Sequence, residues 1–205
     1  MRIIGGNSGG IRINFPKNIN LRPTTDRCKE ALFNILNNEF DFKSIKILDL
    51  FSGTGGISYE FASRGTKKIV SVDKNIKSLY FIKKFSEIQK FNISIVKSDV
   101  FIYIKKINTE FDIIFADPPY KIEDTKYLTI INEIFKKNCL KPDGYLIIEH
   151  SSNKVFNKIQ CFNKSKKYGD TTFSFFKKLN DWLSYNSLQK IEVYLHIIYF
   201  YFFLL

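Results

Sequence analysis

The chain has 205 residues, which suits one domain of ordinary size that can bury a core without disulfides or metals. Its hydrophobic fraction of 44% excludes disorder as the overall state. Lysine and arginine number 32 against 20 acidic residues, and this net charge of +12 indicates either a polyanionic partner such as nucleic acid or a lysine-rich solvated surface. Three separated cysteines and two histidines argue against a metal site and favour a reducing, cytoplasmic location.

The first fifteen residues alternate loosely between apolar and polar types around glycines. This pattern predicts a short β-hairpin in which Arg2 and Arg12 are exposed. Pro23 ends the hairpin segment, and Thr24 or Thr25 can cap a helix that follows it. Apolar side chains then recur at helical spacing and predict one buried stripe. The stripe consists of Cys28, Ala31, Leu32, Ile35 and Leu36.

From Ile45 onward, strand patterns alternate with helical patterns. One helix is expected from about Gly55 to Arg64, a second that Asn75 can cap, and a third around Tyr127. This alternation predicts an α/β fold, a Rossmann-like, seven-stranded, doubly wound sheet covered by helices on both faces. The expected strands are IKILDLF, KKIVSVD, ISIVKSD, FDIIFAD and GYLIIEH, followed by two short strands near residues 158–162 and 172–176.

The end of the chain differs from the rest. The run YLHIIYFYFFLL, which begins at Tyr194, is about 12 apolar residues long, whereas a membrane-spanning helix needs about 20. We expect an extension packed on the domain or an accidental addition to the reading frame, with a membrane anchor as the minor alternative. Residues 177–205 are therefore treated as an atypical tail of unknown role.

Acidic residues stand at the ends of the predicted strands. Ligands of a doubly wound sheet bind where the strands end at their carboxyl edge. The glycine loop DLFSGTGG has Ser58 where a dinucleotide-binding loop needs its third glycine, so it suits a small ligand better than a pyrophosphate. Asp73, about 20 residues beyond Gly53, can bind the hydroxyls of a ribose, and Asp99 can accept from an adenine amino group. These residues predict an adenosine pocket, and S-adenosylmethionine fits it because carboxylates favour its sulfonium charge.

The segment Asp117, Pro118, Pro119 and Tyr120 follows the fourth predicted strand. The Asp117 carboxylate and the Pro118 carbonyl can accept the two N–H bonds of an exocyclic amine and localise its lone pair. The prolines fix φ and hold these acceptors in place. Tyr120 can stack on a base lifted out of its helix. The segment predicts direct in-line methyl transfer to an amine, with Asp117 orienting that amine and no metal required.

These motifs resemble a known family. DLFSGTGG, Asp73, Asp99 and DPPY resemble a class I S-adenosylmethionine-dependent amino-methyltransferase. The segments RPTTDRCKEALFNIL, MRIIGG, DGYLIIEH and KKYGDTTFSFF narrow the resemblance to the RsmD family over about residues 1–176. Members of that family methylate the N2 amine of a guanine in 16S ribosomal RNA.

The resemblance implies roles for particular residues and an architecture. Residues 1–44 would form an RNA-binding, cofactor-closing extension, and residues 45–176 the methyltransferase domain. The implied partner is 16S rRNA or the small ribosomal subunit, bound by a cytoplasmic monomer with no membrane association. The implied cofactor residues are Asp49, Phe51, Gly53, Gly55, Asp73, Lys74, Asp99 and Val100. The implied RNA-contacting residues are Arg2, Arg12, Arg22, Thr24, Thr25 and Arg27.

Two alternatives stay open on the residues alone. The same amine chemistry suits adenine N6 in DNA or RNA, or a glutamine amide of a protein, because the acceptor pair recognises an amine and not a particular ring. A non-catalytic rRNA-binding assembly factor would keep the basic charge and lose the methyl transfer. The intact series of acids favours an enzyme.

Overall fold

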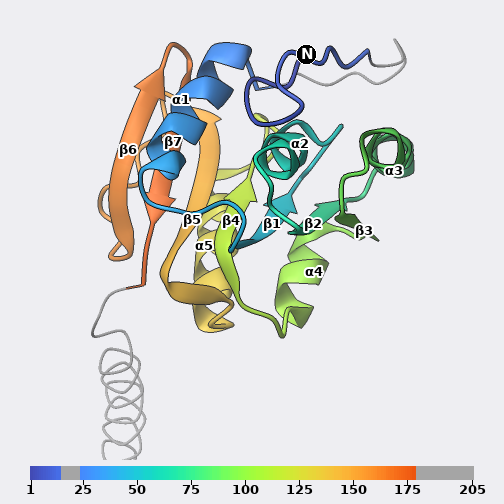
Figure 1. Cartoon of the computed structure of the whole chain (residues 1–205). Helices are drawn as coiled ribbons and strands as arrows, with labels where there is room; N and C mark the ends of the chain where they lie inside the picture. The colour runs from blue at the N-terminus through green and yellow to red at the C-terminus, as the bar shows by residue number, and fades with distance from the viewer. Residues whose placement is uncertain (15–23, 179–205) are drawn as a thin grey trace, which may run out of the picture.

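The computed structural model describes residues 1–14 and 24–178. In this part of the chain, seven strands form one sheet in the order β3-β2-β1-β4-β5-β7-β6, with helices on both faces (Figure 1). The strands are β1 Lys46–Leu50, β2 Lys68–Asp73, β3 Ile93–Lys97, β4 Phe111–Ala116, β5 Leu140–Ser151, β6 Phe162–Tyr168 and β7 Thr171–Phe176. The helices are α1 Asp26–Asn37, α2 Gly56–Ser63, α3 Ile76–Gln89, α4 Val100–Lys106 and α5 Asp124–Lys136.

The winding of the sheet reverses at β1, which pairs in parallel with β2 on one side and β4 on the other. β5 continues the parallel part, and β7 and β6 close the sheet as an antiparallel pair. Leu50 pairs with both Val72 and Ala116, and Ala116 pairs with Ile148. The carboxyl ends of the central strands therefore meet at one edge, and the predicted doubly wound α/β fold is confirmed.

Alternate residues along the strands serve two separate layers of the core. On β4, Ile114 packs in the layer that α4 and α5 cover, whereas Phe115 packs in the layer beneath α1 and α2. β4 is buried on both faces, which explains its continuous apolar run. A third cluster joins Ile3 and Ile13 of the N-terminal segment to Leu79 of α3. The N-terminal segment is thus packed onto the main domain.

The hairpin prediction is confirmed. Residues 1–14 fold back on themselves around a bridge between Arg2 and Arg12, and three backbone hydrogen bonds of 2.8–3.0 Å join the two arms. The loop is also anchored by α2, because Ser8 N–H donates to Ser63 Oγ at 2.9 Å and Ser63 Oγ donates to the Gly5 carbonyl at 2.6 Å. These side-chain bonds attach the hairpin to the main domain.

Two further expectations need correction. In α1, Ala31 and Ile35 are only half-buried, and the buried positions include Lys29 and Phe33. The predicted strand near residues 158–162 is wrong, since β6 begins only at Phe162. β6 is an edge strand with the sequence FNKSKKY, so it lacks the apolar alternation by which a half-buried strand is recognised.

The terminal tail from residue 179 onward and Pro23 lie outside the described residues. Within the described ranges, the structure has no helix that is both long and apolar enough to span a bilayer.

Candidate active site

Backbone hydrogen bonds tie together the loops that follow the strands. Ser52 N–H donates to the Val72 carbonyl at 3.1 Å, linking the loops after β1 and β2. Ser98 N–H donates to the Asp73 carbonyl at 3.1 Å, which links β3 to β2 in the same way. Asp117 N–H lies 3.4 Å from the carbonyl oxygen of Leu50. The ends of β1 to β4, and with them Asp73, Asp99 and Asp117, therefore lie along one edge of the sheet.

The glycine loop after β1 has an unusual backbone. Phe51, Gly53 and Gly55 have φ values of 57°, 50° and 87°, all in the left-handed region. A Cβ at Gly55 would lie 2.7 Å from the Tyr59 ring and 2.9 Å from a side-chain carbon of Ile82, so glycine is required there. Such a loop brings backbone close to a ligand, as the predicted cofactor loop needs.

Asp49 is buried beside the start of α2 and is not exposed at the glycine loop. Its carboxylate is 2% exposed and accepts from the backbone N–H of Ser58 at 3.2 Å and from Ser58 Oγ at 2.5 Å. Ser58 Oγ is also 2.7 Å from Ser71 Oγ, so the bonds join β1, α2 and β2. Burial raises the pKa of Asp49 to about 7, with Asp73 adding a smaller repulsion. The sequence analysis noted Ser58 only as the residue that replaces a third glycine, and it did not indicate Ser71, because an isolated serine carries no pattern.

Asp73 and Asp99 follow neighbouring strands and have local partners. Asp73 accepts from Gly53 N–H at 2.8 Å through one oxygen and from Asn75 N–H at 2.8 Å through the other. It thereby fixes the glycine loop as well as the start of α3. Asp99 caps α4, where one of its oxygens accepts from the N–H groups of Phe101 and Ile102 at 2.9 and 3.2 Å. Of their predicted neighbours, Lys74 is exposed and Val100 is packed in the core.

The DPPY segment begins where β4 ends. Asp117 is half-buried, Pro118 is buried and Pro119 is exposed. The Pro119 carbonyl accepts from Ile122 N–H at 2.8 Å, so the second proline closes a turn before α5. Tyr120 is 37% exposed, and its hydroxyl lies 3.4 Å from Thr171 Oγ1 at the start of β7. The segment thus presents a carboxylate and an aromatic ring at the same sheet edge as the glycine loop.

The residues before α1 connect the N-terminal extension to this edge. Thr25 caps α1 by accepting from Cys28 N–H at 3.2 Å. Thr24 Oγ1 donates to Glu149 Oε2 at 2.7 Å, and Glu149, 3% exposed, lies at the carboxyl end of β5. Glu149 was not among the predicted site residues, although GYLIIEH was recognised as a strand. Arg27 is exposed, and Arg22 lies outside the described residues.

A buried ion network holds the extension against α2. Glu60, 0% exposed, accepts from Lys29 Nζ at 3.0 Å, from Arg64 Nη1 at 2.5 Å and from Ile4 N–H at 2.8 Å. Lys29 Nζ also donates to the Arg2 carbonyl. The exposed guanidinium of Arg2 pairs with Asp26 at 2.9 Å. Hydrophobic periodicity could not indicate this network, because it places two charged residues in the interior.

Comparison with known proteins agrees with this geometry. The family model described as Conserved hypothetical protein 95 matches residues 1–177. The chain belongs to this family. The ribosomal RNA small subunit methyltransferase D of Buchnera aphidicola subsp. Baizongia pistaciae is 32% identical over 187 residues, which cover 88% of this chain and 93% of that protein. This match bears out the RsmD resemblance of the sequence motifs.

Solved structures show the same fold. A putative methyltransferase, yhhF, from Escherichia coli is 25% identical with a TM-score of 0.75, covering 87% of this chain and 97% of that chain. The Thermus thermophilus 16S rRNA N2 G1207 methyltransferase, solved with AdoMet and guanosine, is 20% identical with a TM-score of 0.62, covering 76% of this chain and 44% of that chain. The chain therefore has the class I S-adenosylmethionine-dependent methyltransferase fold. Its family and its curated relative make it a methyltransferase.

Proposed function

We propose that this enzyme transfers a methyl group from S-adenosylmethionine to the N2 amine of a guanine in small-subunit ribosomal RNA. The observation that supports it most is the convergence of the glycine loop, Asp73 and the DPPY segment on one sheet edge, in a chain of the Conserved hypothetical protein 95 family. The rRNA substrate is carried over from the name of the Buchnera relative. The guanine and its N2 atom come from the motif resemblance and agree with the activity for which the Thermus neighbour is named.

The chain's own residues suit the cofactor. The left-handed loop at Phe51, Gly53 and Gly55 gives access to the strand ends, and Asp73 and Asp99 stand there in succession. Asp49 holds the start of α2 through Ser58, and in the proposal its ionised form favours the cofactor's positive charge through the low-dielectric interior. When bound, S-adenosylmethionine supplies an electrophilic methyl group. Lys74, which is exposed, and Val100, which is packed in the core, are the remaining residues that we assign to the cofactor.

The DPPY residues prepare the accepting amine. An exocyclic amine is a weak nucleophile because its lone pair is delocalised into the base. In the proposal, Asp117 and the carbonyl of Pro118 accept its two N–H bonds and direct the lone pair away from the ring. The turn closed by Pro119 keeps both acceptors fixed before the substrate arrives. Asp117 orients the amine and takes part in removing the proton lost after transfer.

Tyr120 is proposed as the platform for the extruded base. Its ring is partly exposed, and its hydroxyl is near Thr171, so the ring has a supported position. Stacking on an aromatic ring is worth about 1–3 kcal/mol per base. A base that stacks there has its amine beside Asp117, only three residues earlier in the chain.

We assign RNA contact to the extension, residues 1–44, and catalysis to residues 45–176. Arg2, Arg12 and Arg27 are exposed on the extension, where they can meet phosphates. The bond from Thr24 to Glu149, near the carboxyl end of β5, supports a position of the extension beside the site. The proposed enzyme works as a cytoplasmic monomer on the small ribosomal subunit. Arg22 and Thr25 complete the proposed RNA-contacting set, Thr25 by capping α1.

The test is replacement of Asp117 with alanine. Methyl transfer from labelled S-adenosylmethionine to small ribosomal subunits is expected to fall at least about 100-fold, since general acid–base and orienting groups contribute about 10²–10⁴. Asp143→Ala serves as the matched control, because Asp143 is an exposed carboxylate before the apolar run of β5. Calorimetric binding of S-adenosylmethionine to both variants checks that each is folded. An Asp117→Ala enzyme within a few-fold of the parent would contradict the assigned role.

A further inference from the structure

Helix α3 has a broad exposed face that the proposed catalytic site does not use. Ile76, Tyr80 and Ile88 are 57%, 57% and 73% exposed, which is unusual for large apolar side chains. At 100° per residue, the exposed positions cover about 140° of the helix, with Tyr80 near the middle. The complete α3 face consists of Ile76, Lys77, Tyr80, Lys83, Lys84, Glu87 and Ile88.

This face combines positive charge with an aromatic ring. It carries three lysines and one glutamate, and exposed Lys74 and Lys90 flank it along the chain. Lys84 Nζ lies 4.8 Å from the centroid of the Tyr80 ring, so the ammonium group and the ring form one platform. A flat ring surrounded by lysines suits single-stranded nucleic acid, whose bases stack while its phosphates meet the cations. A purely apolar protein partner would gain nothing from the lysines.

The position of α3 connects this face to both parts of the proposed site. α3 is capped by Asn75, two residues after Asp73 at the carboxyl edge of the sheet. Its buried side packs Leu79 and Ile82 against Ile3 and Ile13 of the N-terminal loop. Figure 1 shows α3 at the outer edge of the molecule, beside β3 and away from β6. With its 14 residues, α3 extends the basic surface by about 21 Å from the catalytic edge.

We propose that the α3 face is a second RNA-docking surface, which binds rRNA outside the target nucleotide. This inference rests on the proposed function, because it takes the substrate to be rRNA. Lys77, Lys83 and Lys84 neutralise phosphates, and Tyr80 stacks on an unpaired base. The buried side of α3 packs on the N-terminal loop that presents Arg2 and Arg12, so in the proposal one strand of RNA follows both.

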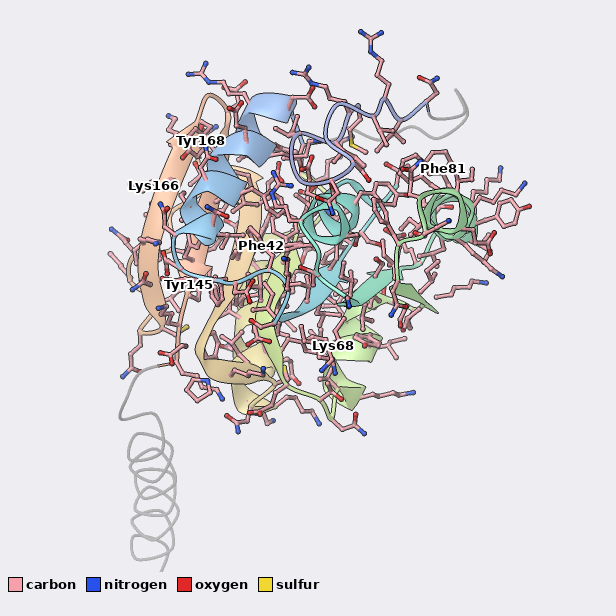
Figure 2. All side chains as sticks on the ribbon, in the orientation of Figure 1. Phe42, Lys68, Phe81, Tyr145, Lys166 and Tyr168 are labelled. Carbon is pink, nitrogen blue, oxygen red and sulfur yellow. The ribbon has the colours of Figure 1, made fainter. Side chains whose placement is uncertain are left out.

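The experiment compares two pairs of adjacent exposed lysines. The test variant is Lys83→Glu/Lys84→Glu, and the matched control is Lys166→Glu/Lys167→Glu on β6. β6 lies at the opposite end of the sheet from β3, against which α3 packs, and Figure 2 labels Phe81 on α3 and Lys166 on β6 at opposite sides of the molecule. Binding of a protein-free small-subunit rRNA fragment is measured over a salt series, together with kcat and KM for methyl transfer.

The α3 variant should bind the rRNA fragment at least about 10-fold more weakly, with a salt slope shallower by about 1.5 from two lost phosphate contacts. KM for RNA should rise, whereas kcat should stay within twofold of the parent value. The affinity for S-adenosylmethionine should not change. Tyr80→Ala should weaken binding at least about 5-fold, whereas Tyr80→Phe keeps the stacking ring and should match the parent within twofold.

Three outcomes would each contradict a different proposal: the docking surface, its RNA partner, or the proposed function. An active parent whose α3 variant behaves like the β6 control would overturn the docking surface alone. Unchanged affinity for the bare fragment with weaker binding of whole subunits would assign the α3 face to a ribosomal protein and would also overturn the RNA proposal. A parent that binds the fragment through α3 but transfers no methyl group to RNA would overturn the proposed function and leave the docking surface standing.

Discussion

Replacement of Glu60 with glutamine should destabilise the protein severely. The carboxylate of Glu60 is fully buried and accepts from Lys29, Arg64 and the N–H of Ile4. Glutamine keeps one acceptor oxygen but removes the charge, which leaves the Lys29 ammonium, 1% exposed, without its closest anion. Breaking a buried pair in this way costs about 3–5 kcal/mol. We expect the lower end of this range, because Lys29 Nζ still donates to the Arg2 carbonyl and lies 3.6 Å from Asp26 Oδ1.

Urea unfolding followed by circular dichroism measures this effect as the change in the free energy of unfolding. A loss of about 3 kcal/mol corresponds to a melting temperature lower by about 6–12 °C. Glu30→Gln on the exposed side of α1 is the matched control, and it should change stability by less than about 0.5 kcal/mol. A Glu60→Gln protein within about 1 kcal/mol of the parent would show that the buried ion network contributes no net stability, contrary to this prediction.

Two further predictions concern the N-terminal loop and the cofactor loop. Gly6→Ala should lower the free energy of unfolding by about 2 kcal/mol more than Gly10→Ala in urea unfolding. A Cβ at Gly6 would lie 2.1 Å from the Ser63 carbonyl oxygen, whereas at Gly10 nothing lies within 4 Å. Equal losses would count against the docked loop. The pKa of Asp49 is raised from 3.8 to about 7, so the protonated form stabilises the fold below pH 3.8 and this contribution is lost as the pH rises towards 7. Asp49→Asn should therefore show a flatter stability profile than the parent between about pH 4 and pH 7, and parallel profiles would contradict the assigned burial effect.

The fold could be predicted from the sequence wherever burial imposes a simple period. β4 is buried on both faces and reads as a continuous apolar run, and the caps at Thr25 and Asn75 are confirmed because a side-chain oxygen at that position has a local partner. β6 was misplaced because an edge strand rich in lysine has no apolar face to show.

The candidate site could be predicted in its outline, since strand ends of a doubly wound sheet meet at a known edge. What the sequence could not give is the set of contacts between distant residues. Thr24 and Glu149 are 125 positions apart, and Lys29 and Glu60 are 31 apart, so their pairing depends on the finished packing. The buried Lys29 also contradicts the expectation that charged side chains stay at the surface. Its burial is explained by the pairing with Glu60, which only the folded structure shows.

Methyl transfer to guanine N2 is tested by mass spectrometry of nucleosides from small ribosomal subunits that have been incubated with the enzyme and S-adenosylmethionine. We expect N2-methylguanosine from the parent enzyme, and none above background from the Asp117→Ala variant. Methylation of adenine N6, methylation of a protein glutamine with unmodified RNA, or equal N2-methylguanosine from both enzymes would contradict it.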